Sequence, residues 1–250
     1  MNFGIRFKEL KNLIKYILQQ ILGYEKYLYL FSKFKISTLK SDSKEKDFFI
    51  FLDMIPNGST VLDIGANIGI MTYFLSKKAR TISFEPIPSN YKVLTKIIDN
   101  YSLSNVEPFE LALSNENKEM TMILPVVGSA KMQGLSHMKH DSITEFNEGI
   151  EVSVSCVMLD DFVESHSIDG ISGIKIDVEN FEYYVLKGGF KSIQNFRPII
   201  YIELWDNENR QKCFELFKEL NYNICIVERG KTILYKPEVH FKQNFIILPK

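Results

Sequence analysis

The stretch that decides the fold is Val61-Leu62-Asp63-Ile64-Gly65-Ala66-Asn67-Ile68-Gly69, in which an apolar run ends in a turn of small residues. The run before the turn has the composition of a buried strand, and the residues after it have helical spacing. Gly65 and Gly69 allow the backbone to come close to a ligand, and Asn67 tolerates a positive φ better than most residues. We therefore expect a strand, a tight turn that can hold a ligand, and a helix.

Short apolar runs alternate with helical stretches from residue 41 onward, which is typical of an α/β domain with a largely parallel sheet. We expect seven main strands, at 60–64, 80–85, 106–113, 174–178, 198–204, 222–228 and 245–248. Further strands are expected at 120–127 and 151–157, with a short one at 232–235. Helices are expected at 43–55, 69–78, 181–193 and 207–220, and one capped by Ser89 that runs to Tyr101. The C-terminal strands are expected to form an antiparallel hairpin.

The composition excludes several classes of protein. The 250 residues are 45% hydrophobic and 24% charged, as in a folded globular chain, and the net charge of −1 argues against a nucleic-acid binder. Cys156, Cys213 and Cys225 lie far apart without a paired motif, which favours a reducing, cytoplasmic compartment. The longest uncharged run, 64–76, is too short to cross a bilayer.

Residues 1–40 differ from the rest of the chain. They hold eight basic and two acidic residues, a net charge of +6 that leaves −7 for residues 41–250. Apolar residues recur in them at helical spacing, so we expect a basic amphipathic helical extension. It either lies on an anionic membrane surface or packs as a cap on the main domain or on a second subunit. Without a small-residue cleavage site it does not resemble a signal peptide.

Glu85 strengthens the prediction of a cofactor site. It ends the second expected strand 22 residues after Asp63, close to the offset at which an acid receives the ribose hydroxyls of a nucleotide. The alternative for such an acid is a helix cap or a solvated charge. A dinucleotide site would normally carry three glycines, whereas this turn has Asn67 and Ile70 at two of those positions.

A second group of charged residues ends the strand expected at 174–178. Lys175, Asp177 and Glu179 alternate with apolar residues, so they share one face at the edge where open α/β sheets bind ligands. Asp177 first, or Glu179, is a candidate to orient a substrate hydroxyl or take its proton, with Lys175 holding the carboxylates ionised. A divalent ion or a purely structural ion pair would also explain the pattern. Glu203 could join the same edge.

Residues 128–149 lack clear periodicity and are expected to form a loop. Their place between two expected strands makes them a candidate lid over the site. The segment contains His137 and His140, either of which could be a general base, although a loop histidine is more often solvated.

The spacing Asp63-x-Gly65-x-Asn67-x-Gly69 resembles the cofactor turn of class I S-adenosylmethionine methyltransferases. The ordered motifs over residues 60–205 resemble the FkbM methyltransferase family: VLDIGANIG, SFEPIPSNY, VMLDDF, GIKIDVENFEYYVLKGG and RPIIYIEL. The family commonly has Gly where this chain has Asn180, a residue that can adopt the same left-handed backbone.

This resemblance implies a Rossmann-like class I methyltransferase domain over residues 41–250 that binds S-adenosylmethionine. The implied cofactor residues are Asp63, Gly65, Asn67 and Gly69 around the methionine part, Glu85 with Pro86 at the ribose, and Ala112 with Leu113 near the adenine. It also implies O-methylation of a sugar, glycan or polyketide-like hydroxyl, with any metal requirement open. A nicotinamide-dependent oxidoreductase and a non-catalytic cofactor-binding protein are the alternatives.

Overall fold

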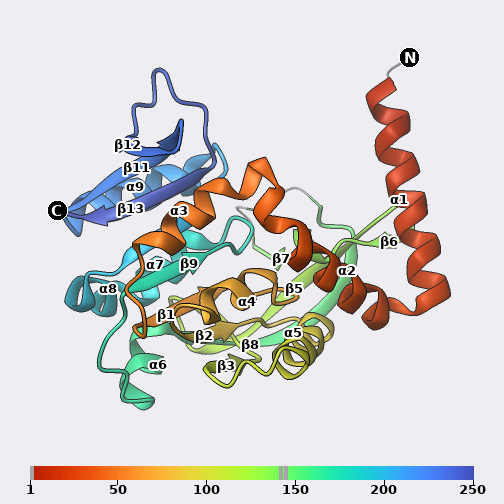
Figure 1. The fold of residues 1–250 in the computed structure, drawn as a ribbon, viewed down its shortest axis with the longest axis horizontal. Helices are drawn as coiled ribbons and strands as arrows, with labels where there is room; N and C mark the ends of the chain where they lie inside the picture. The colour runs from red at the N-terminus through yellow and green to blue at the C-terminus, as the bar shows by residue number, and fades with distance from the viewer. Residues whose placement is uncertain (1–2, 141–142, 144–145) are drawn as a thin grey trace.

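A computed structural model describes residues 3–140, 143 and 146–250, and its main feature is a twisted sheet (Figure 1). Within these residues the sheet has eight strands, in the order β12-β11-β13-β10-β9-β1-β2-β3. Their bounds are β1 (Thr60–Ile64), β2 (Arg80–Phe84), β3 (Val106–Phe109), β9 (Gly173–Ile176), β10 (Ile199–Glu203), β11 (Tyr222–Glu228), β12 (Lys231–Leu234) and β13 (Asn244–Pro249). Neighbouring strands pair in parallel along β10-β9-β1-β2-β3. The pairs β10–β13, β13–β11 and β11–β12 are antiparallel. The predicted fold class is confirmed, but the expected number of seven strands is wrong by one because β12 joins the edge.

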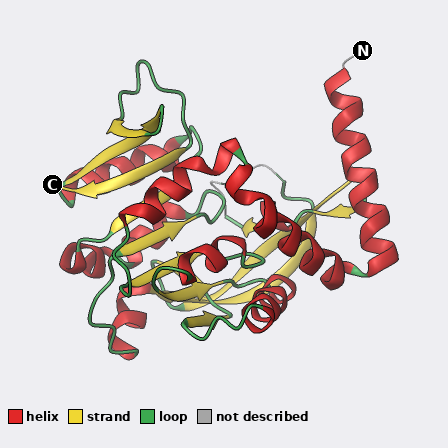
Figure 2. Ribbon diagram, viewed as in Figure 1, coloured by secondary structure: helices red, strands yellow, loops and turns green. Residues whose placement is uncertain are grey.

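Helices cover both faces of this sheet (Figure 2). They are α3 (Lys46–Met54), α4 (Ile70–Ser76), α5 (Pro88–Asn100), α6 (Leu159–Ser165), α7 (Glu182–Gly188), α8 (Phe190–Phe196) and α9 (Glu208–Glu219), with short 3-10 turns η1 (Leu39–Ser41) and η2 (Ser43–Glu45) before α3. Neighbouring strand residues point to opposite faces. Val61 shares a buried cluster with Phe51 of α3, while Leu62 shares another with Val185 of α7 and Phe217 of α9. The sheet is therefore buried on both sides.

The N-terminal extension forms two helices, α1 (Phe3–Leu22) and α2 (Tyr24–Thr38). They are separated at Gly23, whose φ of 77° ends the first helix. Helix α2 packs on the main domain, where Leu28 clusters with Val93 and Ile97 of α5. The N-terminal end of helix α1 extends beyond the domain (Figure 1). No helix in the described part of the chain is long and apolar enough to span a membrane.

A second, smaller sheet lies beside the first. Among the described residues it contains β4 (Ala112–Ser114), β5 (Lys118–Val127), β6 (Ala130–Lys131), β7 (His137–Met138) and β8 (Gly149–Met158). The single strand expected at 106–113 is wrong, because the chain leaves the large sheet after Phe109 and pairs with β8 from Ala112. The expected loop at 128–149 is also partly wrong, since it holds β6, the 3-10 turn η3 (Gln133–Leu135) and β7.

Several element boundaries differ from the prediction. Strand β9 ends at Ile176, so Asp177 and Glu179 lie in the loop that follows it. The helix expected at 181–193 is divided into α7 and α8 at Gly189. Helix α5 begins at Pro88 without a side-chain cap, because proline already has the φ of the first helical position, and the cap expected at Ser89 is wrong.

The strand order creates a crevice at the carboxyl end of β1. After β1 the chain proceeds through β2 to β3 on one side and later returns to β9 on the other side. Loops after β1 and β9 therefore leave in opposite directions, which is the place where open α/β sheets bind ligands.

Candidate functional site

The turn after β1 has the backbone geometry that its sequence predicts. Gly65, Asn67 and Gly69 all have positive φ, at 77°, 50° and 80°. At Gly65 a side chain is also excluded by space, because a Cβ would overlap the carbonyl oxygen of Asp177. The absence of a side chain therefore lets the loops after β1 and β9 touch.

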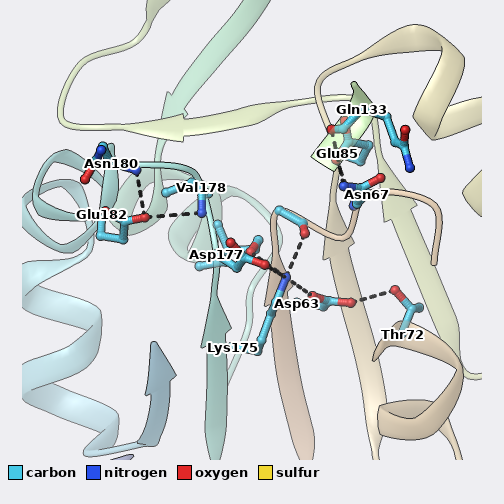
Figure 3. A network of polar contacts seen from close by, with 12 residues as sticks. Asp63, Asn67, Thr72, Glu85, Gln133, Lys175, Asp177, Val178, Asn180 and Glu182 are labelled. Carbon is cyan, nitrogen blue, oxygen red and sulfur yellow. Dashed lines mark hydrogen bonds and ion pairs between the residues drawn. The ribbon is translucent and has the colours of Figure 1, made fainter. Parts of the chain in front are cut away.

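A buried ion pair lies beneath this turn (Figure 3). Lys175 Nζ lies 3.3 Å from Asp63 Oδ1 and 4.0 Å from Asp177 Oδ2. It also donates to the carbonyl oxygens of Gly65 at 2.7 Å and of Ile64 at 3.3 Å. Thr72 donates to the other oxygen of Asp63 at 2.6 Å. Lys175 thus fastens the turn, the strand β1 and the loop after β9 to one another.

The neighbouring carboxylates stabilise the charged form of Lys175. Burial alone would lower the pKa of Lys175, but Asp63 and Asp177 outweigh this effect and raise it above its usual value. Asp63 is fully buried, and Lys175 is only 3% exposed. We conclude that both residues hold the site together from below rather than line it.

Glu85 follows β2 and is buried beside the turn. Its Oε2 accepts from the backbone N–H of Asn67 at 2.8 Å, and its Oε1 accepts from the N–H of Ile87 and the amide of Asn90. Burial raises the pKa of Glu85 to about 7, even though these hydrogen bonds lower it. The carboxyl group is therefore fixed in orientation and faces the cavity described next.

A cavity lies above the turn, and its wall includes eight of the residues expected from the sequence: Gly65, Asn67, Glu85, Pro86, Ala112, Leu113, Asp177 and Glu179. Asp63, Gly69 and Lys175 are not part of this wall. Gly69 instead begins α4, close to Leu94 of α5. The wall also includes Asn90, in the first turn of α5, and Gln133, in the segment without periodicity. The sequence did not single them out, because nothing in either local pattern marks a buried amide.

Three amide oxygens on this wall are buried without a hydrogen-bond partner among the described residues: Asn67 Oδ1, Asn90 Oδ1 and Gln133 Oε1. Buried polar atoms are rarely left unpaired in folded proteins. A ligand with several N–H and O–H groups would satisfy them. These oxygens and the Glu85 carboxyl group are hydrogen-bond acceptors that fit an adenosyl amino acid. Such a ligand carries donors in its ribose hydroxyls, its adenine amino group and its α-ammonium group.

The loop after β9 carries two consecutive residues in left-handed conformation, Glu179 at φ 52° and Asn180 at φ 71°. Glu182 holds this loop, since its Oε1 accepts from the backbone N–H groups of Val178 and Asn180 (Figure 3). The left-handed geometry expected for Asn180 is confirmed. Such strained backbone occurs preferentially at functional sites, where surrounding contacts maintain it.

Several carboxyl groups converge on this loop. Burial raises the pKa of Glu179, and Asp177, Glu203 and Glu182 raise it further. Burial also raises the pKa of Glu182 to about 7. Glu179 lines the cavity above the turn and also a second hollow beyond it, so it stands at the junction of the two.

The described structure gives little support for His137 or His140 as a general base, or for a bound metal ion. Both ring nitrogens of buried His137 face carbonyl oxygens, of Leu135 at 2.9 Å and of the Asn147 side chain at 3.0 Å, so the ring is engaged within its own segment. His140 lies against the Tyr184 ring. In the ranges that the structure describes, no three His, Cys, Asp or Glu side chains are grouped so that they could hold a metal ion.

Comparison with known proteins gives a consistent result. The family model described as "Methyltransferase FkbM domain" matches residues 63–232. The hexuronic acid methyltransferase AglP of Haloferax volcanii is 24% identical over 185 residues, which cover 74% of this chain and 72% of AglP. Methyltransferase sdnD of Sordaria araneosa is 25% identical over 181 residues, which cover 61% of this chain and 68% of the relative.

Among solved structures, the methyltransferase FkbM from Methylobacillus flagellatus superposes with a TM-score of 0.51 at 14% identity. The match covers 95% of this chain and 59% of that protein, so the chain spans less than two thirds of its length. At this level of identity the likeness shows the fold alone.

The structural role of Lys175 leads to a prediction about stability. Lys175→Met leaves the Asp63 carboxylate buried without its cation, and we expect a loss of about 3–5 kcal/mol in the free energy of unfolding, measured by urea denaturation. Adding Asp63→Asn to this variant should recover part of the loss. Lys187→Met, at an exposed position of α7, is the control and should change the value by less than about 0.5 kcal/mol. If Lys175→Met and Lys187→Met changed the free energy of unfolding equally, this would contradict the role assigned to Lys175.

Proposed function

We propose that this chain, which belongs to the FkbM family of S-adenosylmethionine-dependent methyltransferases, methylates a hydroxyl group of a sugar or glycan. The observation that carries the proposal is the meeting of two groups of residues around one cavity. Asn67 and Glu85 come from the β1 and β2 edge, and Asp177 and Glu179 come from the loop after β9. A relative named for a hexuronic acid supports a glycan acceptor.

The proposed binding of S-adenosylmethionine uses the residues of the cavity wall. Glu85 would accept the ribose hydroxyls, and the turn from Gly65 to Asn67 would hold the amino-acid part. The apolar pair Ala112 and Leu113 would lie against the adenine. The unpaired amide oxygens of the wall are acceptors for the remaining N–H groups.

The proposed chemistry requires proximity and the removal of one proton. Bound S-adenosylmethionine supplies an electrophilic methyl group, and its transfer to a hydroxyl oxygen releases the hydroxyl proton. Asp177, whose side chain is 37% exposed, is our first candidate to orient the hydroxyl and hold that proton, with Glu179 second. Lys175 acts through its contacts to the turn and to Asp177, as a positioning residue.

Calorimetric titration of the purified chain tests the cofactor. We expect binding of S-adenosylmethionine and S-adenosylhomocysteine but not of NAD. Glu85→Gln should weaken S-adenosylhomocysteine binding about tenfold or more, because it removes a charged acceptor. Since the pKa of Glu85 is about 7, protonation should weaken wild-type binding between pH 8 and pH 6, and the variant should lack this dependence.

The control for this titration is Glu228→Gln, at an exposed position of β11, which should bind like the wild type. Binding of NAD alone would overturn the proposed function and favour an oxidoreductase. Binding of S-adenosylmethionine with no transfer of labelled methyl to any of a set of glycans would favour a cofactor-binding protein.

Turnover tests the role of Asp177. Asp177→Asn should lower the rate of methyl transfer about 100-fold or more while the dissociation constant for S-adenosylhomocysteine stays within about threefold. Transfer of labelled methyl to a hydroxylated acceptor is the measurement. A normal rate in this variant, together with a large loss in Glu179→Gln, would transfer the role to Glu179.

Helix α1 supports a further proposal, contact with an anionic membrane. Its half-buried and buried positions, which face the domain, are Asn12, Lys15, Tyr16, Gln19 and Leu22. Gln19 exchanges two hydrogen bonds of 3.0 Å with the backbone of Lys131 in β6, and Lys15 lies 3.5 Å from the sulfur of Met132. The helix therefore packs on the domain with a mainly polar face.

The opposite face of α1 is apolar and exposed. It consists of six residues that are 40–74% exposed: Leu10, Leu13, Ile14, Ile17, Leu18 and Ile21. The part of the expected stripe on α1 therefore does not pack on the main domain of its own chain, whereas Leu28 of α2 does. Residues 1–40 carry a net charge of +6, so an anionic lipid surface complements this extension, whereas a second copy of it would bring like charges together.

Co-sedimentation with vesicles tests this contact. We expect binding to vesicles with phosphatidylglycerol and at least about tenfold weaker binding for Ile17→Gln/Ile21→Gln, which removes apolar contact without changing charge. Leu234→Gln, at an exposed apolar position of β12, is the matched control. A dimer in sedimentation that the double variant dissociates, without vesicle binding, would overturn the proposal in favour of self-association.

A further inference from the structure

A second hollow adjoins the cavity at Glu179, and nothing in the proposed cofactor site uses it. It lies between the loop after β9 and the segment between β10 and α9. Its described wall consists of Leu135, His137, Ile143, Phe146, Glu179, Asn180, Trp205, Asp206, Asn207 and Gln243. A molecule in this hollow would reach the cavity past Glu179.

The wall has the chemistry that recognises a sugar ring. Trp205 offers a flat aromatic surface for the C–H face of a ring, and Asn180, Asn207 and Gln243 offer amide donors and acceptors for hydroxyl groups. The amides of Asn180 and Asn207 are already oriented, because Asn207 Nδ2 donates to Asn180 Oδ1 at 2.7 Å. The backbone of Gln243 is fixed beside Trp205 by the N–H of Leu204, which donates to its carbonyl oxygen at 2.7 Å.

The described wall of the hollow also lacks a basic residue that could pair with an acidic ligand. Glu179 and Asp206 are on its wall, and no Lys or Arg is among the wall residues that the structure describes. Arg210 is 4% exposed and donates to Asp206 and to the carbonyl oxygen of Leu204, so its charge is used beneath the surface. Lys212 lines a neighbouring hollow and pairs with Glu208 at 2.8 Å.

The surroundings of Glu179 disfavour a negative charge. The pKa values of Glu179 and Glu203 are raised by burial and by Asp177, so an additional negative charge at this place is unfavourable. An acceptor carboxylate or phosphate would meet this repulsion without a cation to pair with. An uncharged sugar avoids it, and an ammonium group would be attracted.

We propose that the hollow bounded by Asn180, Trp205 and Gln243 is the acceptor subsite and that it takes a neutral or amino sugar in preference to a uronic acid or a sugar phosphate. This inference rests on the proposed methyl transfer to a sugar hydroxyl. It adds the place where the sugar binds and the charge that it carries.

The chain's single tryptophan gives a direct test, since the emission of Trp205 reports on this hollow. The full-length protein, saturated with S-adenosylhomocysteine, is titrated with methyl glucoside, glucosamine and glucuronate, which share one ring and differ in charge. We expect the emission to respond to the first two, with at least about tenfold weaker binding of glucuronate. Equal or tighter binding of glucuronate would overturn the charge preference.

A charge variant completes the test. Gln243→Lys places a cation on the wall at an exposed position, and we expect it to tighten glucuronate binding at least about fivefold. Gln211→Lys, at an exposed position of α9 outside the hollow, should not do so. If S-adenosylhomocysteine binds but no sugar changes the emission in any variant, the subsite is wrong and the methyltransferase proposal stands. If S-adenosylhomocysteine does not bind, the proposed function itself fails.

Discussion

The contacts of Lys175 are the constraint on which the rest of the site depends. One buried ammonium group joins the carboxylate at the end of β1, two carbonyl oxygens of the turn after it, and the first acid of the loop after β9. These three segments are far apart in the sequence and meet only because β1 and β9 are neighbours in the sheet. Separation of Lys175 from Asp63 is unfavourable, since it would leave two charges unpaired in the interior. The cavity above it therefore has a rigid floor.

On this floor the site separates into two halves with different electrostatic character. The cofactor half, around Glu85 and the turn, presents hydrogen-bond acceptors, several of which lack a donor among the described residues. The other half, around Glu179, concentrates acids whose pKa values are raised by burial and mutual repulsion. The proposed methyl donor carries a positive charge, which suits a place whose surroundings disfavour negative charge. The proposed acceptor hollow extends the acidic half, which is why its charge preference follows from the same geometry.

Helix α1 connects this site to the proposed membrane contact. Its polar face hydrogen-bonds to the backbone of Lys131 and contacts Met132, immediately before Gln133, which is part of the cavity wall. The chain thus uses the polar side of an amphipathic helix for internal packing and leaves the apolar side exposed. Globular proteins usually bury the apolar face of such a helix, so its exposure supports the proposed contact with a lipid surface. Sequence periodicity identified the stripe, but it could not show which face the domain would contact.

The sequence by itself determined the strand-turn-helix unit from Thr60 to Ser76, the acid at Glu85 and the acidic loop after β9, because these follow from local composition and backbone preference. Positive φ at Gly65, Asn67 and Asn180 is likewise a property of those residues. Only the tertiary structure decided that Asp63 and Lys175 lie beneath the cavity, that Asn90 and Gln133 join its wall, and that Trp205 and Glu179 line one second hollow. It also decided that the expected third strand would divide between two sheets at Phe109. These features depend on which distant segments pack together, and the free energy of that packing is not contained in any local pattern of residues.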